Sequence, residues 1–156
     1  MSKNPTTKEG YEMLQKELKH LLSVERPKVI QDISEARSHG DLKENAEYHA
    51  AKEKQSMIES RIQYINNLIA SAEVIDTASI QSDKVLFGAT VEYEDTETGE
   101  VTSWRIVGQA EGDVKLNKIS VQSPIAQALL GKKEGDTVDI RVPKGNIEVE
   151  ILSVSY

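Results

Sequence analysis

The feature that most constrains the fold is one glycine, Gly40, which lies between two long stretches with helical periodicity. Before it, apolar residues recur at the spacings of a coiled-coil seam, in Tyr11, Leu14, Leu18 and Leu21. After it, the same kind of seam returns in Ile58, Ile62, Ile65, Ile69 and Ala72. Because only a few residues separate the two helices, they must lie antiparallel. The first half therefore predicts an antiparallel coiled-coil hairpin with its tip near residues 40–44.

Local signals set the expected bounds of the helices. Thr7 fits an N-cap, and Pro27 lacks a backbone donor and clashes with the carbonyl four residues back, so we expect a kink or a restart there. The apolar stripe resumes in Val29, Ile30, Ile33 and Ala36 and ends at Gly40. The second helix is expected from about Asp41 to Ala72. Met57 and Leu68 widen its stripe, and close approach of the helices is expected at the small residues Ala46, Ala50 and Ala51.

The length of the hairpin is itself informative. Roughly 30 residues at about 1.5 Å rise per residue give an arm of about 45 Å. That is longer than a small domain needs to build its own core, which favours an arm that reaches toward another molecule. An ordinary helical hairpin folded onto the second half remains the alternative.

In the second half the apolar period changes from about 3.6 residues to about 2, which predicts strands. The strands are expected at residues 85–93, 101–107, 119–121, 138–142 and 147–154. Ser123 and Pro124 fit the N-cap and first position of a short helix over residues 124–130. The order of elements predicts an antiparallel sheet with one helix packed on it.

These patterns predict two domains in an α+β fold class. Residues 1–76 form the antiparallel coiled-coil domain, and residues 80–156 form the sheet domain. Residues 74–83 lack periodicity and are interpreted as a linker.

Composition excludes several function classes. The chain has no cysteine, which excludes disulfides, thiolate catalysis and zinc–thiolate sites. Its net charge of −7 argues against a general duplex-binding protein, because phosphate binding needs clustered Lys and Arg. Residues 1–10 are polar and no run of 18 apolar residues occurs, so we expect neither a signal peptide nor a membrane span. The expected location is the cytoplasm.

Two carboxylates, Asp41 and Glu44, lie three residues apart at the expected start of the second helix. One interpretation is a capping box, in which each side chain bonds the other residue's backbone N–H. The other is that both point outward and coordinate a hard cation such as magnesium, which takes six oxygen ligands. Two exposed carboxylates cannot complete such a site, so another macromolecule would have to supply the rest. Spacing alone favours the capping box but allows both roles.

Other polar residues near the tip give weaker signals. Arg37 and Lys52 lie near enough to the tip to meet a phosphate backbone, although a solvated helix face also accounts for them. His20, His39 and His49 have no metal-ligand spacing and are interpreted as solvated, with His39 as a potential contact. We find no glycine-rich phosphate loop and no Ser-His-Asp arrangement.

Three segments carry a resemblance to a known family. The longest is EARSHGDLKENAEYHAA, residues 35–51, and it is highly specific. The others are VLFGATV at residues 85–91 and ISVQSPIAQALLGKKEGD at residues 119–136. Together they resemble the bacterial Gre transcription elongation factors, over nearly the whole chain.

The resemblance implies an N-terminal antiparallel coiled coil and a C-terminal domain similar to the FKBP fold. It implies that the C-terminal domain docks on the rim of the RNA polymerase secondary channel and that the coiled coil enters the channel. Asp41 and Glu44 would then help to hold the second active-site magnesium and to position the attacking water, and the polymerase would cut the backtracked RNA. The chain would share Mg²⁺ with the polymerase and meet the RNA 3′ end, with no tightly bound cofactor and no complete active site of its own.

The resemblance also implies docking at the turn before the short helix, at Ser123 and Pro124, although helix capping accounts for this pair too. One branch of the family carries a large basic patch on the coiled coil. The scattered bases here favour the other branch. We therefore expect short cleavage products and a preference for lightly backtracked complexes. Two alternatives stay open: a channel-binding inhibitor of the same architecture, and a prolyl isomerase or chaperone, for which the chain has few aromatic residues.

Overall fold

The computed structural model describes residues 3–40 and 44–156. It divides into two compact units, each described here by itself. The first comprises residues 11–71, and the second joins the segment that ends at Gly10 to residues 72–156.

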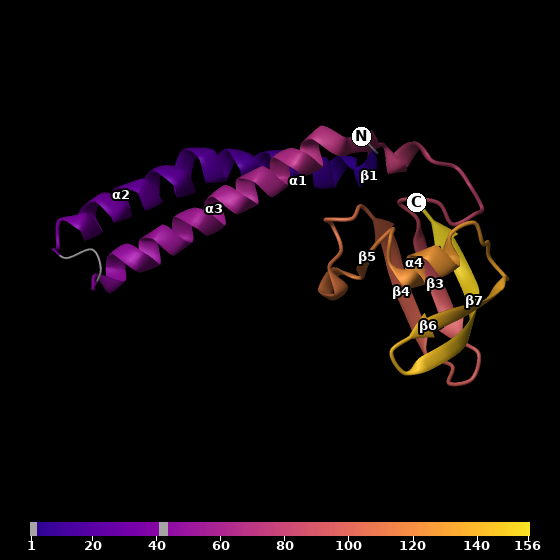
Figure 1. Ribbon diagram of the computed structural model, residues 1–156. Helices are drawn as coiled ribbons and strands as arrows, with labels where there is room; N and C mark the ends of the chain where they lie inside the picture. The colour runs from indigo at the N-terminus through magenta and orange to yellow at the C-terminus, as the bar shows by residue number, and fades with distance from the viewer. Residues whose placement is uncertain (1–2, 41–43) are drawn as a thin grey trace. The chain divides into compact units, whose positions relative to one another are not determined.

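The first unit is a long helical hairpin, as predicted. Its elements are α1 (Lys8–His20), the π-helical turn η1 (Leu21–Glu25), α2 (Arg26–Arg37) and α3 (Ala46–Ser71). Figure 1 shows α2 running antiparallel beside α3, the two packing along their length. None of the helices in the described part of the chain has the length and hydrophobicity needed to cross a membrane.

The hairpin core is a narrow apolar seam. Val29, Ile58 and Ile62 form a buried cluster, against which the partly buried Leu18 and Leu21 pack. The prediction that Ile30 and Met57 belong to the seam is wrong, because their side chains are exposed: Ile30 is 52% exposed and Met57 is 67% exposed. Each directly adjoins a buried residue in the sequence, and neighbouring side chains on a helix point about 100° apart.

The restart predicted at Pro27 is confirmed. The α-helical ladder gives way to η1 over Leu21–Glu25, and α2 begins at Arg26 with Pro27 as its second residue. Proline removes the N–H that would pair four residues back and crowds that carbonyl, so the preceding turn widens to a π-turn. One continuous seam is nevertheless maintained on both sides of the turn.

The start of the chain folds with the second unit through a parallel strand pair. β1 (Asn4–Thr7) pairs with β2 (Ala72–Ile75), with Thr7 opposite Ile75. The interpretation of residues 74–83 as a linker is therefore wrong at its beginning, and Thr77–Ser79 also form a short 3₁₀ helix, η2. A polar strand that contains proline shows no alternation, so the sequence gives no local signal for this long-range pair.

A polar clasp holds the start of α1. Thr7 is its N-cap, as predicted, because the Thr7 Oγ1 accepts the Gly10 N–H at 3.0 Å. The Glu111 carboxylate accepts the Thr7 N–H at 3.1 Å and the Gly108 N–H at 2.7 Å, and it also accepts the Thr7 hydroxyl. A Cβ on Gly10 would lie 2.1 Å from Glu111 Oε1, so a larger residue here would have to displace the Glu111 carboxylate from its place. We call Thr7, Gly10, Gly108 and Glu111 the Glu111 clasp.

The main sheet of the second unit has the strand order β5-β4-β3-β7-β6. Its elements are β3 (Thr90–Asp95), β4 (Val101–Val107), η3 (Val114–Leu116), β5 (Lys118–Ser120), α4 (Pro124–Leu129), β6 (Thr137–Val142) and β7 (Gly145–Ser155). The predicted order of strands and helix is confirmed. The expectation of a wholly antiparallel sheet is wrong, because β4 and β5 pair in parallel. The η3 turn and Asn117, whose backbone is left-handed (φ 57°), return the chain so that β5 lies beside β4 and runs in the same direction.

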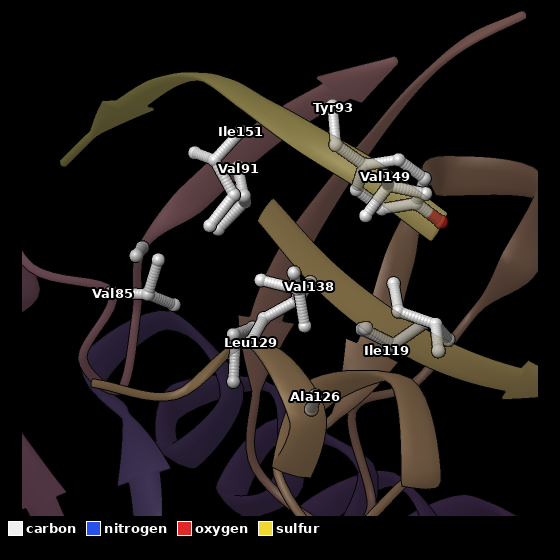
Figure 2. Close-up of a cluster of buried hydrophobic side chains, with 12 residues drawn as sticks. Val85, Val91, Tyr93, Ile119, Ala126, Leu129, Val138, Val149 and Ile151 are labelled. Carbon is white, nitrogen blue, oxygen red and sulfur yellow. The ribbon is translucent and has the colours of Figure 1, made fainter. Parts of the chain in front are cut away.

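One apolar core fills the second unit between the sheet and α4. Figure 2 shows Ala126 and Leu129 of α4 facing side chains from several strands. Val91, Ile106 and Ile140 are fully buried there. Burial raises the pKa of Tyr93 at the edge of this core, and its hydroxyl accepts the Trp104 Nε1–H at 3.0 Å.

Candidate functional site

The end of α2 shapes one side of the hairpin tip. The Ser38 hydroxyl donates to the Glu35 carbonyl oxygen at 2.5 Å, and the His39 N–H donates to the Ala36 carbonyl oxygen at 3.2 Å. Gly40 has a φ of 121°, a region that side chains strongly disfavour. Glycine therefore lets the chain leave the helix here, as the sequence predicts, although the last helical residue is Arg37.

Asn45 forms the other side of the tip. Its Oδ1 accepts the Tyr48 N–H at 3.0 Å, so Asn45 is the N-cap of α3. Its Nδ2 donates to the Ala36 carbonyl oxygen at 2.5 Å. One side chain thus ties the end of α2 to the start of α3. Sequence reasoning missed this role, although asparagine directly before a helical stretch is a recognised N-cap signal.

Of the two predicted acids, Glu44 is described and Asp41 lies outside the described residues. The expected helix start near Asp41 is wrong, because α3 begins at Ala46. Glu44 therefore lies in a turn before the cap, and does not occupy the third helical position of a capping box. Its side chain is exposed, which suits a carboxylate that meets a ligand from outside.

A second group of side chains crosses the tip next to Asn45. The His39 Nδ1 lies 3.1 Å from Glu47 Oε2, and both side chains are largely exposed. The Arg37 guanidinium lies over the Tyr48 ring, 5.9 Å from its centroid. His39, which we considered as a contact, is thus paired within the chain, while Arg37 is held at the end of α2 in an exposed position.

Lys52 is exposed on α3, about 9 Å along the helix axis from Ala46. Its Nζ donates to Gln55 Oε1 at 3.3 Å. It therefore lies further from the turn than Arg37, although both are on the tip half of the hairpin. Of the small residues near the tip, Ala51 is buried as expected, but Ala46 and Ala50 are exposed.

The donor chemistry of the tip fits magnesium only in part. Carboxylate oxygens are suitable ligands for this hard cation. Over residues 3–40 and 44–156, however, no group of three or more His, Cys, Asp or Glu side chains is placed to hold a metal ion. Glu44 could contribute to a site that other molecules complete.

Comparison with known families decides what the chain is. A family described as "Transcription elongation factor, N-terminal" matches residues 4–74, and one described as "Transcription elongation factor, GreA/GreB, C-term" matches residues 80–156. The chain belongs to the GreA/GreB family of transcription elongation factors. The resemblance carried by the tip sequence is thereby confirmed.

Similar proteins bear the same description. The transcription elongation factor GreA of Anaeromyxobacter sp. (strain K) is 58% identical over 156 residues, covering 100% of this chain and 94% of that protein. GreA of Pelobacter propionicus is 55% identical, covering 97% of this chain and 96% of that protein. Among solved structures, GreA factor homolog 1 of Thermus thermophilus is 29% identical with a TM-score of 0.46, covering 99% of both chains.

The remaining residues predicted from the Gre resemblance lie in the second unit. Ser123 is the N-cap of α4, where its Oγ accepts the Ala126 N–H at 3.2 Å, and Pro124 is the first helical residue. The capping interpretation of this pair is thus confirmed. Pro124 is also exposed, so a docking role at this turn stays a prediction.

Proposed function

We propose that this GreA/GreB family member binds RNA polymerase, inserts its helical hairpin into the secondary channel and stimulates cleavage of backtracked RNA. The family membership supports a role in transcription elongation. The observation that carries the finer proposal is an exposed acid, Glu44, in the turn at the end of a long, narrow hairpin. Such a hairpin can carry a carboxylate into a channel that a compact domain could not enter.

In this proposal Asp41 and Glu44 supply oxygen ligands to the second magnesium of the polymerase active centre. That ion, when bound, stabilises the charge that develops on the attacking and leaving oxygens. The residues of this chain bind and orient, and the polymerase, the RNA phosphate and water supply the other ligands. The protein therefore acts as a cofactor of the polymerase, in the cytoplasm, and has no complete active site of its own.

Four other residues contact the RNA or the polymerase in this proposal. Arg37 extends from the end of α2 and meets the RNA or polymerase near the 3′ end, held in place by its contact with Tyr48. Lys52 makes a more distant contact with a phosphate. Ser123 and Pro124 contact the rim of the channel, where Ser123 fixes the shape of the turn by capping α4.

The test uses a backtracked elongation complex with Mg²⁺, in which the RNA 3′ end is followed over time. We expect rapid shortening with the wild-type protein. Asp41→Asn and Glu44→Gln each keep the size of the side chain and remove its charge, and should slow cleavage by roughly 100-fold, as for loss of an electrostatic group at a reaction centre. Glu12→Gln is the matched control, because it removes one charge from an exposed position of α1, away from the tip.

Cleavage at the wild-type rate by both tip variants would refute magnesium donation by these residues. Binding that blocks elongation without shortening the RNA would instead identify the chain as a channel-binding inhibitor. Both outcomes are scored in the same reaction, since full-length extension and 3′-end loss are visible together.

A further inference from the structure

We propose that Asn45 is a positioning residue for the tip carboxylate of Glu44. Its amide closes the turn between α2 and α3 and so fixes the direction in which Glu44 projects. This inference rests on the proposed function, and it adds a residue that does not itself contact the metal.

The hydrogen bonds of Asn45 join the end of α2 to the start of α3, where the exposed His39–Glu47 pair and the Arg37–Tyr48 contact also cross the tip. The last carbonyls of a helix and the first N–H groups of the next lack intrahelical partners. The Asn45 amide serves one of each: the Ala36 carbonyl oxygen at 2.5 Å, which also accepts the His39 N–H, and the Tyr48 N–H at 3.0 Å. The segment between, residues 37–44, carries both Asp41 and Glu44 in sequence, so this side chain clamps its two ends.

Apolar packing does not hold the described residues of this segment in place. Arg37, His39, Gly40 and Glu44 are all exposed, whereas Ala36 just before it is buried and Asn45 just after it is half-buried. Among the described residues, the turn is therefore held by backbone hydrogen bonds, by the Asn45 clamp on its two ends, and by the exposed His39–Glu47 and Arg37–Tyr48 contacts. Holding a ligand group in place before it binds lowers the entropy lost on binding, which is the general benefit of preorganisation.

The chemistry of the clamp requires an amide. An amide side chain both donates and accepts, whereas an ionised carboxylate only accepts. Aspartate and serine are N-caps about as good as asparagine. Asn45→Asp therefore keeps the cap and places a carboxylate against the Ala36 carbonyl, and Asn45→Ser keeps the cap with a side chain too short to span both partners. Asn45→Gln keeps both hydrogen-bonding functions on a longer side chain.

The first measurement is made on the free protein, without polymerase or metal. The ¹⁵N relaxation of the Glu44 amide is compared between wild type, Asn45→Ser and Asn45→Gln. We expect the Glu44 order parameter to fall from about 0.85 toward about 0.6 in Asn45→Ser. The Ile58 amide, in the middle of α3, should stay at its wild-type value, which shows that the helix remains folded. Asn45→Gln should restore part of the order.

The second measurement is the cleavage reaction at several factor and Mg²⁺ concentrations. For Asn45→Ser and Asn45→Asp we expect the rate at saturating factor to fall about tenfold, by misplacement of the reacting groups. The factor concentration for half-maximal rate should not change, because docking is untouched. Raising Mg²⁺ should recover part of the loss, and Asn45→Gln should cleave faster than Asn45→Ser.

The outcomes separate this inference from the proposed function. Unchanged Glu44 order and an unchanged saturating rate in Asn45→Ser, with Glu44→Gln inactive, would show that Asn45 is only a helix cap. Wild-type cleavage by Glu44→Gln would refute magnesium donation by Glu44, while a fall in Glu44 order in Asn45→Ser would still establish the clamp. If Asn45→Ser instead raised the factor concentration for half-maximal rate and also lowered the order parameter of Ile58, the effect would come from loss of the helix, which would refute positioning.

Discussion

The hairpin tip and the sheet domain are held by opposite kinds of interaction. In the sheet domain Val91, Ile106 and Leu129 have no exposed surface, and they pack in one apolar core. At the tip, the described residues between Ala36 and Asn45 are exposed, and hydrogen bonds at the two helix ends define the turn. Burial contributes most of the free energy of folding, whereas a single polar tie contributes little. Mutations should therefore be able to alter the stability of the protein and the geometry of the tip separately.

The largest effect on stability is expected in the sheet core. Leu129→Ala removes a fully buried side chain from α4 and leaves a cavity, which should lower the free energy of unfolding by about 2–5 kcal/mol. The measurement is denaturant unfolding followed by the fluorescence of Trp104, the one tryptophan of the chain, which lies on β4 beside this core. Leu116→Ala is the matched control: Leu116 is 63% exposed in the same unit, and its loss should change stability by no more than about 0.5 kcal/mol.

The same unfolding experiment tests whether the tip and the sheet core contribute separately to stability. Glu44→Gln changes only an exposed side chain at the tip, so its Trp104 transition should coincide with that of the wild type. A tip variant that shifted this transition as far as Leu129→Ala does would show that the two regions are not energetically separate.

An intermediate effect is expected at the Glu111 clasp, which is polar like the tip but partly buried like the core. Glu111→Ala leaves the Thr7 and Gly108 N–H groups without their acceptor, at a cost of about 1–3 kcal/mol. Thermal unfolding and amide hydrogen exchange at Thr7 and Gly108 measure the loss. Glu134→Ala, at an exposed loop position, is the control. If Glu111→Ala were as stable as this control, the clasp would contribute as little to the free energy of unfolding as the tip does.

The two regions also differ in how far their structure could be predicted from the sequence. Elements that bury a regular stripe were predictable: the Ile58, Ile62 and Ile65 seam, the alternation in β6 and the capped helix α4. The β1–β2 pair and the parallel pairing of β5 were not, because their partners are far apart in sequence or follow an irregular turn. These pairings depend on tertiary context, which overrides weak local preferences.

The candidate site was predictable in a different way. The positions of Asp41, Glu44 and Arg37 near a helical bend came from spacing, but their roles came from the family resemblance. Spacing placed the start of α3 near Asp41, because acids and Gly40 all favour a helix start there. The structure starts the helix at Ala46, since Asn45 satisfies the Tyr48 N–H and the Ala36 carbonyl together. Asparagine before a helical stretch is itself an N-cap signal, but the hydrogen bond from Asn45 to the Ala36 carbonyl oxygen depends on the packing of two helices and could not be predicted from the sequence.

The smallest effect is expected from an ion pair on the side of the hairpin, where neither burial nor the tip turn is involved. The Arg26 guanidinium donates two hydrogen bonds to the Glu59 carboxylate, each at 2.8 Å. The hydrogen bond from Arg26 lowers the pKa of Glu59. A carboxyl with a lowered folded pKa contributes stability above its ordinary pKa, and that contribution is lost as the pH falls through the lowered value. Glu59→Gln should thus lower the melting temperature by roughly 1 °C at neutral pH, as for an exposed pair.

The difference should vanish in acid once the pH is well below the lowered pKa of Glu59, where the wild-type carboxyl is protonated as well. It should also shrink in 1 M salt, because exposed charges are screened. Circular dichroism at 222 nm follows the hairpin. Glu53→Gln controls for the loss of one charge, because Glu53 is exposed on the same helix and has no ion-pair partner among residues 3–40 and 44–156. A Glu59→Gln effect that persisted unchanged at low pH would arise from packing of the side chain, and the side of the hairpin would then resemble the sheet core more than the tip.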